Sequence, residues 1–273
     1  MKIYVSKMII AAIFIFIFFI MLEVLIEVVF PVYRPVSVLG SPSLKNNFKI
    51  VQISDVHSKK LGEYSLKKIR EFNPDFIAVT GDVVNRYDKE LVNVSDFAEK
   101  ISKLGIPVYY VTGNHDTSPV EKNEKIISIF KDMGITILRN QSAFIDESNV
   151  TVVGINDWNT DRPDLSKAFK DVQKTSYVVL LSHNPVVYYH LGKYKVDLVL
   201  SGHTHGGQIS LPLLGPLALP DQNYKDLEPL TKGLIPLEDD GGWIYIDSGY
   251  GTSSLPIRFM NRSQISFITI NKE

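Results

Sequence analysis

The sequence predicts an α/β fold, a layered domain with two packed sheets, preceded by an N-terminal transmembrane helix. Three observations favour this fold. An uncharged apolar run opens the chain, strand-like runs alternate with helical stretches through its middle, and strands with few helices follow towards its end. The chain has 273 residues, which is enough to bury a substantial core.

The N-terminal run is the strongest compositional anomaly. Met8–Leu22 is apolar and uncharged, and apolar residues continue to Phe30, interrupted only by Glu23 and Glu27. A transmembrane helix needs about 20 apolar residues, so residues 1–30 are long enough for a transmembrane signal anchor. A cleaved signal peptide, whose apolar region is shorter, is the alternative, although no small-residue cleavage site is evident. A buried helix of the domain is a third interpretation.

The charges around this run predict its orientation. Lys2 and Lys7 precede it, whereas two glutamates lie near its end. Because positively charged flanks stay in the cytoplasm, we expect a single-pass protein of the cell membrane whose remaining residues, including the globular domain, are extracytoplasmic.

Residues 31–47 are rich in residues that interrupt regular structure: Pro31, Pro35, Gly40, Pro42 and several Ser and Asn. This composition predicts a linker without regular structure. The globular domain is then expected over residues 48–273.

Within that domain, short apolar runs bounded by polar residues predict buried strands. These are Phe48–Ile53, Phe76–Thr80, Val108–Thr112, Thr151–Ile155, Tyr177–Leu181, Asp197–Leu200, Trp243–Asp247 and Ile265–Ile270. Helices are predicted over Tyr64–Phe72, Lys89–Leu104 and Glu121–Met133, the last two ending at a glycine that favours a C-terminal cap.

Polar clusters follow five of the predicted strands. They are Asp55-Val56-His57, Gly81-Asp82, Gly113-Asn114-His115-Asp116, Ser182-His183-Asn184 and Gly202-His203-Thr204-His205-Gly206-Gly207. Ligands of α/β sheets bind beyond the carboxyl ends of strands, so these clusters are expected to converge. Five of the six histidines lie in them, and only His190 does not.

The residue types predict metal chemistry. The chain has no cysteine, and imidazoles with carboxylates suit Mn²⁺, Fe or Zn²⁺, between which these ligands do not discriminate. Seven candidate ligands are too many for one ion and suit two ions that clamp a phosphate; they are Asp55, His57, Asp82, Asn114, His183, His203 and His205. Asp-x-His is expected to be extended, with both side chains on one side. The cluster glycines are expected to allow close backbone approach.

In this order, the five clusters resemble the motifs of the calcineurin-like metallophosphoesterases, from Asp55 to His205. The resemblance implies a four-layer α/β sandwich of two packed mixed sheets flanked by helices. It also implies hydrolysis of a phosphate ester, in which two divalent ions activate the attacking water. The Gly-His-Thr-His-Gly-Gly-Gln form and residues 251–258 resemble a branch with membrane-associated bacterial phosphodiesterases and UDP-diacylglucosamine hydrolases.

The resemblance also implies roles for individual residues. Asp55, His57 and His205 resemble ligands of a first metal, and Asn114, His183 and His203 those of a second, with Asp82 as the bridging ligand. His115 resembles the histidine that steadies the phosphate and protonates the leaving oxygen. Its neighbour Asp116 is expected to orient the His115 ring. Asn85 and Asp116 differ from the pattern of the protein Ser/Thr phosphatases, which argues against that subclass.

The substrate is less sharply predicted. The segment Ile209–Pro220 is unusually apolar and either packs on the domain or forms an apolar wall beside the metals. With the N-terminal helix, it favours a phosphodiester or pyrophosphate of a lipid-linked substrate. Arg86, Tyr87 and Arg258 are candidate substrate contacts, Arg258 alternatively forming an ion pair, and Trp158 either lines the cleft or packs in a loop.

The sequence also allows other functions. They are a phosphomonoesterase or nucleotide pyrophosphatase with a soluble substrate, a metal-binding scaffold, and a nuclease. The formal net charge of −1 lacks the basic surface that nucleic-acid binding requires, so no nucleic acid is expected as a partner.

Overall fold

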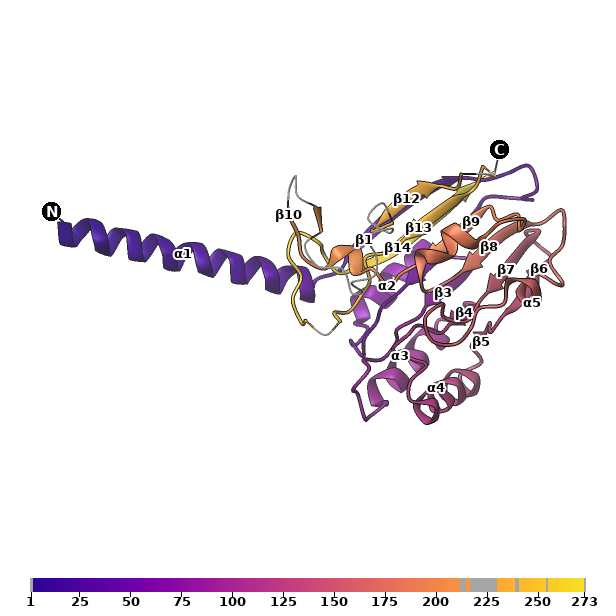
Figure 1. Cartoon of the computed structure of the whole chain (residues 1–273), viewed down its shortest axis with the longest axis horizontal. Coiled ribbons are helices and arrows are strands. Elements are labelled where there is room, and N and C mark those ends of the chain that lie inside the picture. Colours follow the sequence, from indigo (N-terminus) through magenta and orange to yellow (C-terminus); the bar gives the residue numbers. More distant parts are fainter. Residues whose placement is uncertain (1, 212–214, 217–229, 239–240, 254, 273) are drawn as a thin grey trace.

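The computed structural model describes residues 2–211, 215–216, 230–238, 241–253 and 255–272. Helix α1 (Lys2–Val29) projects from the domain as a long rod (Figure 1). Within it, Lys7–Val29 has a mean hydropathy of 3.1, and none of its most apolar window is buried by the protein. Its 23 residues extend on the order of 35 Å, enough for a hydrocarbon core of about 30 Å.

The first sheet has the strand order β1-β14-β2-β3-β4-β5. Its members are β1 (Val32–Leu39), β2 (Phe48–Ile53), β3 (Phe76–Thr80), β4 (Val108–Val111), β5 (Thr136–Ile137) and β14 (Gln264–Asn271). Strands β2 to β5 are parallel to one another, and β14 runs antiparallel to β2. The sheet is therefore mixed, as predicted.

The second sheet has the order β12-β13-β9-β8-β7-β6. Its members are β6 (Gln141–Ile145), β7 (Val150–Gly154), β8 (Tyr177–Leu181), β9 (Leu198–Ser201), β12 (Gly233–Pro236) and β13 (Trp243–Ile246). The central strands β7, β8, β9 and β13 are parallel, and the two edge strands are antiparallel to them.

Three apolar clusters separate four layers, which confirms the predicted sandwich. Alternate residues of a strand point to opposite faces, so Ile50 of β2 packs between the sheets while Val51 packs under the helices. The second sheet behaves in the same way: Val179 faces the first sheet, and Val178 faces the outer layer.

The helices cover the outer faces of the two sheets. On the first sheet lie α2 (Glu63–Phe72), α3 (Val92–Ser102) and α4 (Val120–Asp132). On the second lie α5 (Leu165–Ala168) and the 3₁₀ turn η1 (Pro185–His190). The predicted strands are found within one residue of their expected ends, and the three predicted helices are found with small shifts.

The segment after α1 differs from its prediction. Residues 31–47 were expected to lack regular structure, but Val32–Leu39 forms strand β1, which pairs in parallel with β14 along its whole length. Strand β1 lies at the edge of the sheet, where a proline such as Pro35 costs no ladder hydrogen bond on its free side. The prolines therefore concealed a strand, and only Phe30 and Pro31 lie between it and α1.

The apolar segment after the last histidines is only partly described. Ser210–Leu211 (β10) and Gly215–Pro216 (β11) form a short hairpin that follows η2 (His205–Gly207). The remaining residues of the predicted apolar segment Ile209–Pro220 lie outside the described residues, apart from Ile209, which bridges to Phe259. Its expected role as an apolar wall stays a prediction.

Candidate metal centre

The five polar clusters lie at the carboxyl ends of β2, β3, β4, β8 and β9, as predicted. The first three strands are adjacent in one sheet, and the last two are adjacent in the other. Because both sets end at the same edge of the sandwich, all seven predicted ligands come together there. The fold thus brings ligands that are up to 150 residues apart in the sequence, Asp55 and His205, into one site.

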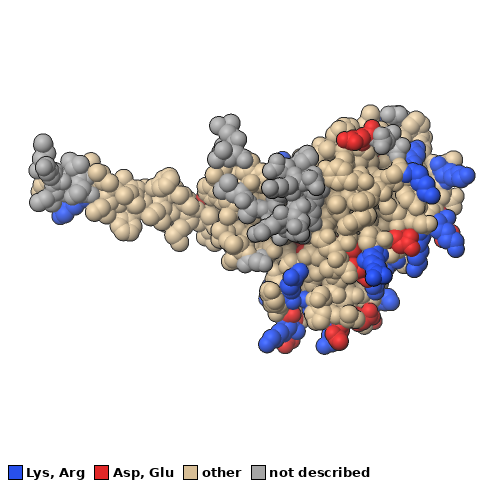
Figure 2. All heavy atoms as spheres, viewed as in Figure 1, with Lys and Arg blue, Asp and Glu red and all other residues tan. Residues whose placement is uncertain are grey.

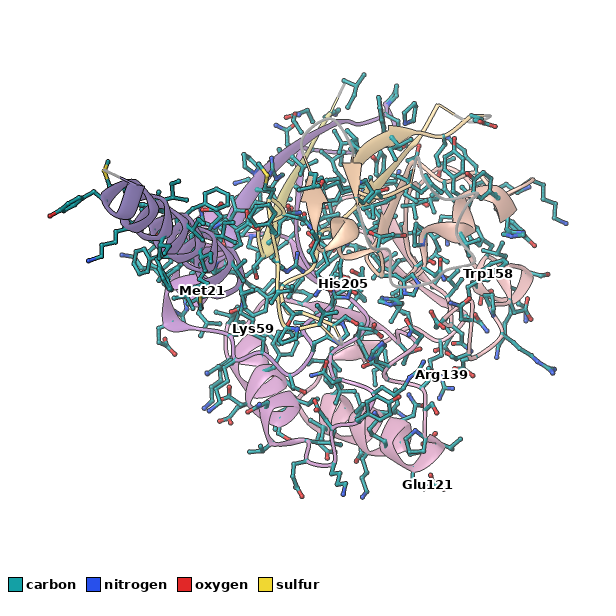
Figure 3. All side chains as sticks on the ribbon, turned by 60° about the vertical axis from the view of Figure 1, so that its left-hand side comes forward. Met21, Lys59, Glu121, Arg139, Trp158 and His205 are labelled. Atoms are coloured by element: carbon teal, nitrogen blue, oxygen red, sulfur yellow. The ribbon has the colours of Figure 1, made fainter. Side chains whose placement is uncertain are left out.

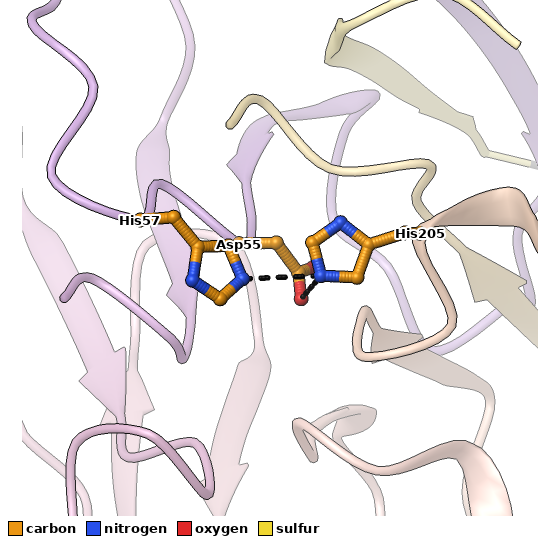
Figure 4. A group of neighbouring side chains, drawn as sticks. All are labelled: Asp55, His57 and His205. Carbon is orange, nitrogen blue, oxygen red and sulfur yellow. Dashed lines mark hydrogen bonds and ion pairs between the residues drawn. The ribbon is translucent and has the colours of Figure 1, made fainter. Parts of the chain in front are cut away.

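A first group of donor atoms comes from Asp55, His57 and His205 (Figure 4). Nε2 of His57 lies 3.1 Å from Nε2 of His205, which lies 3.4 Å from Oδ1 of Asp55. All three side chains are buried. The donors come from two sheets, so the site forms only when the sandwich is assembled.

A second group is built on Asn114, His183 and His203. Oδ1 of Asn114 lies 2.9 Å from Nδ1 of His203 and 3.2 Å from Nε2 of His183, and the two ring nitrogens are 3.2 Å apart. Nδ1 of His183 is 2.8 Å from the carbonyl oxygen of Thr80. A hydrogen bond donated there leaves Nε2 of His183 unprotonated and free to bind a metal.

Asp82 joins the two groups. Its Oδ2 lies 3.3 Å from Nε2 of His183 and 3.8 Å from Nε2 of His57. One carboxylate therefore faces a histidine of each group, which is the position expected of a bridging ligand.

The spacing of these donors fits metal ions. Ligand atoms about 2.0–2.2 Å from a Zn²⁺-sized ion are themselves about 3 to 3.5 Å apart, and most donor pairs of the two groups fall in or near this range. The pair His57–His205 places two ring nitrogens face to face. An ion bound between them would take one lone pair from each ring.

Protonation also suits metal binding. Burial lowers the pKa of His57 to about 4 and that of His203 to about 3, so both rings are neutral at neutral pH. Burial raises the pKa of Asp55 to about 7. Without a metal, His183 and Asp82 form an ion pair, because each holds the other charged: the pKa of Asp82 lies well below its usual value and that of His183 well above. A metal ion at Nε2 of His183 would displace the proton from that nitrogen and leave the one on Nδ1, which faces the Thr80 carbonyl.

The backbone at the ligands was predicted incorrectly. Asp55 and His57 are not extended, since their φ angles are 51° and 46°. Asp82, His203 and His205 are also left-handed, at 53°, 68° and 52°. Such conformations cost non-glycine residues about 1–3 kcal/mol each and are concentrated at functional sites. The Asp-x-His side chains therefore converge through tight turns.

The cluster glycines allow the expected close approach. A Cβ atom on Gly113 would overlap the carboxylate of Asp82, and one on Gly202 would overlap the side chains of Ser54 and Asp55. Both glycines are thus required by the ligands that they face.

His115 lies next to Asp82 and His57 and is not one of the seven predicted metal ligands. Its Nε2 is 4.0 Å from Oδ2 of Asp82, and its Nδ1 accepts a hydrogen bond of 3.0 Å from the backbone N–H of Arg86. Burial lowers the pKa of His115, so the ring is neutral and carries its proton on Nε2, which faces the site.

Asp116 does not orient His115 through its side chain, in contrast to the expectation. Its carboxylate is fully buried and accepts hydrogen bonds from the backbone N–H groups of Asp82, Val83, Val84 and Gly113 and from the hydroxyl of Tyr110. Asp116 therefore holds the turn that carries Asp82, and the backbone of Arg86 takes the orienting role.

Arg258 is fully buried. Its guanidinium donates to the carbonyl oxygens of Ser248, Gly249, Gly251 and Asn261. A direct contact between Arg258 and a substrate phosphate is not supported by this burial. Arg258 instead organises the loop after β13, which lies against Asp55 through a hydrogen bond from Gly251 to the Asp55 carbonyl.

The other predicted contacts separate into exposed and packed residues. Arg86 and Tyr87 are exposed at the rim of the site, next to His115. Trp158 stacks on His190, with ring centroids 4.3 Å apart, and it lies away from His205 in Figure 3. Of the two predicted positions for Trp158, packing in a loop is the one found.

Asp157 is a further buried carboxylate near the site that was not among the predicted residues. This carboxylate is buried, has one oxygen without a hydrogen-bond partner, and lies close enough to help hold His183 charged. Asn156 and Asp157 directly follow the residues of strand β7 and its extension, Ile155. Asp157 therefore follows a predicted strand directly, which is the same signal in the sequence that identified the five clusters.

Comparisons with known proteins agree with this geometry. Residues 48–207 match the family model of the calcineurin-like phosphoesterases. The chain is 30% identical to the metallophosphoesterase YkuE of Bacillus subtilis (strain 168), over 82% of this chain and 79% of that protein. It is 27% identical to the UDP-2,3-diacylglucosamine pyrophosphatase LpxG of Chlamydia trachomatis, over 76% of this chain and 78% of that one.

The fold has a counterpart among solved structures. The protein TT1561 of Thermus thermophilus superposes with a TM-score of 0.50 at 12% identity, covering 74% of this chain and 89% of that chain. The converging ligand groups, the sandwich and the family match lead to one conclusion. The chain belongs to the calcineurin-like phosphoesterases and is a metallophosphoesterase, a hydrolytic enzyme with candidate clusters for divalent metal ions.

Proposed function

We propose that this enzyme holds two divalent ions, Mn²⁺, Fe or Zn²⁺, and hydrolyses a phosphodiester or pyrophosphate bond of a lipid-linked substrate. The observation that carries the proposal is the position of Asp82, whose Oδ2 lies within 3.8 Å of His57 and 3.3 Å of His183. Asp55, His57 and His205 would hold one ion, and Asn114, His183 and His203 the other. When bound, such ions neutralise phosphate charge and lower the pKa of the attacking water.

The residues around the ions have separate tasks in this proposal. Asp116 keeps the Asp82 turn in place. His115 keeps a proton on Nε2, from which it donates a hydrogen bond to a phosphate oxygen and to the leaving oxygen, where negative charge develops. Arg86, exposed at the rim, is the proposed substrate contact.

The membrane part of the proposal rests on α1. We infer that α1 stays attached as an anchor, with the N-terminus in the cytoplasm and the domain outside. Glu27, in its last turns, is buried, and its Oε2 accepts a hydrogen bond of 2.9 Å from the backbone N–H of Asn261. A segment removed as a signal peptide has no reason to make such contacts. The relative LpxG is named a UDP-2,3-diacylglucosamine pyrophosphatase, which supports a substrate of this kind.

The test is hydrolysis of an aryl phosphodiester and of the matching monoester. Metal-stripped full-length protein is assayed alone and after adding Mn²⁺, Zn²⁺ or Fe²⁺. We expect metal-dependent cleavage of the diester that Asp82→Asn abolishes and that Asp146→Asn, at an exposed carboxylate, leaves intact. Cleavage of the monoester alone would favour the phosphomonoesterase alternative. Full activity in Asp82→Asn would overturn the assignment.

A further inference from the structure

A pocket of roughly 610 Å³ lies between the end of α1 and His57. One wall is formed by residues 28–31 of α1 and the chain that follows it. The others are formed by residues 57–65 and by Tyr250 and Thr252 of the loop after β13. The pocket therefore connects the base of the apolar helix with a histidine of the candidate metal centre.

The walls of the pocket are largely apolar. Residues 28–31 are all uncharged, and Val29 and Phe30 are about half exposed. Two of the three tyrosine hydroxyls that line the pocket are bonded within the protein: Tyr33 pairs with Ser65 at 3.0 Å, and Tyr250 donates to the carbonyl of Lys60 at 3.0 Å. The rings of Tyr33 and Tyr64 pack edge to face. The pocket thus offers mainly hydrocarbon and ring surface to an occupant.

The junction with α1 is held by several hydrogen bonds, so the pocket stays beside the helix. Lys59, which lies between α1 and His205 in Figure 3, donates to the carbonyls of Val28 and Tyr250 at 2.6 and 3.0 Å. Arg262 donates to the carbonyl of Phe30 at 2.6 Å. On the face that Figure 2 shows, most of the visible charged side chains lie on the side of the domain remote from α1.

We propose that this pocket receives a hydrocarbon chain of the substrate, so that a membrane lipid phosphate enters from the bilayer along the base of α1 and reaches the metal centre at His57. The inference rests on the proposed function. Its support is the continuity of the apolar pocket with a helix long enough to span a membrane, and a volume within the 300–1,000 Å³ of typical small-molecule sites. A soluble phosphoester needs no such surface beside the metal ligands.

Gly62 offers a way to fill the pocket. Its backbone is extended, with φ of −82°, and a Cβ atom there would meet nothing within 4 Å. Gly62→Phe therefore adds bulk without backbone strain, and Gly62→Ser is the matched control that leaves the pocket open. Thr252→Phe adds bulk from the opposite wall, in case one variant folds poorly.

The assay compares methyl and dodecyl 4-nitrophenyl phosphodiesters, with the metal-loaded full-length protein in one detergent. Each buried methylene favours binding by a factor of about four, so the wild type should prefer the dodecyl ester by about tenfold or more in kcat/KM. Both Phe variants should lose this preference while hydrolysing the methyl ester within about twofold of the wild type. Gly62→Ser should keep the preference.

An independent readout is photolabelling in phosphatidylcholine vesicles that contain a phosphatidic acid with a diazirine at the end of its acyl chain. We expect labelled peptides that contain Tyr64 or Tyr250, and their loss in Gly62→Phe. Label confined to α1, or the same chain-length preference in the wild type and both Phe variants, would overturn the pocket. Hydrolysis of the methyl ester by Asp82→Asn would instead overturn the proposed function.

Discussion

His183 and His115 have different functions in the proposed site because a different backbone group contacts Nδ1 of each ring. At His183, the Thr80 carbonyl takes the proton of Nδ1, so Nε2 offers a lone pair. At His115, the Arg86 N–H occupies the lone pair of Nδ1, so Nε2 keeps the proton. One histidine is thereby suited to bind a metal and the other to donate to a phosphate.

His115→Asn tests this division. We expect kcat to fall by about 10²–10⁴-fold for a diester with an alkyl leaving group, because the hydrogen-bond donor to the leaving oxygen is lost. The loss should be much smaller when 4-nitrophenolate leaves, since that anion needs no proton. Steady-state kinetics on both substrates, with metal content measured on the same samples, checks this. His190→Asn, which is stacked on Trp158 away from the site, serves as the control.

The pKa values of Asp55 and Asp116 predict a pH dependence. Burial raises both to about 7 in the metal-free protein, from 3.8. A raised folded-state pKa stabilises the fold below about pH 4, and this stabilisation is lost as pH rises through about 7. The Tm of metal-stripped protein should therefore fall between pH 5 and 8.

Metal binding should show the opposite trend. An ion requires the ionised Asp55, so the affinity for Mn²⁺ should rise with pH towards 7, by up to about tenfold per unit for each proton released. Calorimetric titration at several pH values, in buffers of different ionisation enthalpy, measures both the affinity and the protons. An affinity that does not change from pH 6 to pH 8 would contradict this account.

At the scale of elements, the buried strands were predictable and the turns that follow them were not. Strands such as β2 and β8 are apolar on both faces because each lies between two layers, and that pattern is visible in the sequence. The left-handed backbones of Asp55 and His57 are invisible there, because neither residue is a glycine. Asp116 was misjudged because its partners are backbone amides, which the sequence does not distinguish.

Strand β1 was missed for a different reason. Its pairing with β14 depends on a contact more than 200 residues away in the sequence, as between Val32 and Gln264. A contact between residues so far apart cannot be predicted from local composition. Pro35, in addition, is typical of a linker. The consequence is practical: residues 31–47 cannot be removed as if they were a tether.

Truncation tests this conclusion. A chain beginning at Pro31 keeps β1 and should remain folded, with a reduced Tm because the contacts of Glu27 and Val28 are lost. A chain beginning at Phe48 uncovers the edge of β14, and an open apolar edge promotes aggregation. We expect its Tm to be lower by about 10 °C or more, or the protein to aggregate. Thermal unfolding with light scattering distinguishes the two chains, and equal Tm values would show that β1 is dispensable.

The two ends of the molecule differ: α1, which is apolar, projects from the domain (Figure 1), and most of the visible charged side chains lie on the domain (Figure 2). We expect the domain to be extracytoplasmic. The chain has no cysteine, so single cysteines can be labelled without background. In intact bacteria, Ser128→Cys on α4 should react with a membrane-impermeant maleimide, and Tyr4→Cys on α1 should react only after lysis. The reverse pattern would place the domain in the cytoplasm.

Only two residues, Phe30 and Pro31, connect α1 to β1. An enzyme joined to its membrane helix by a long flexible linker can move away from the bilayer and bind substrates from the aqueous phase. A domain fixed to its helix keeps one pose and searches by lateral diffusion in the plane of the membrane. Its turnover should then follow the mole fraction of substrate among the lipids, and it should fall when inert lipid is added at constant bulk concentration.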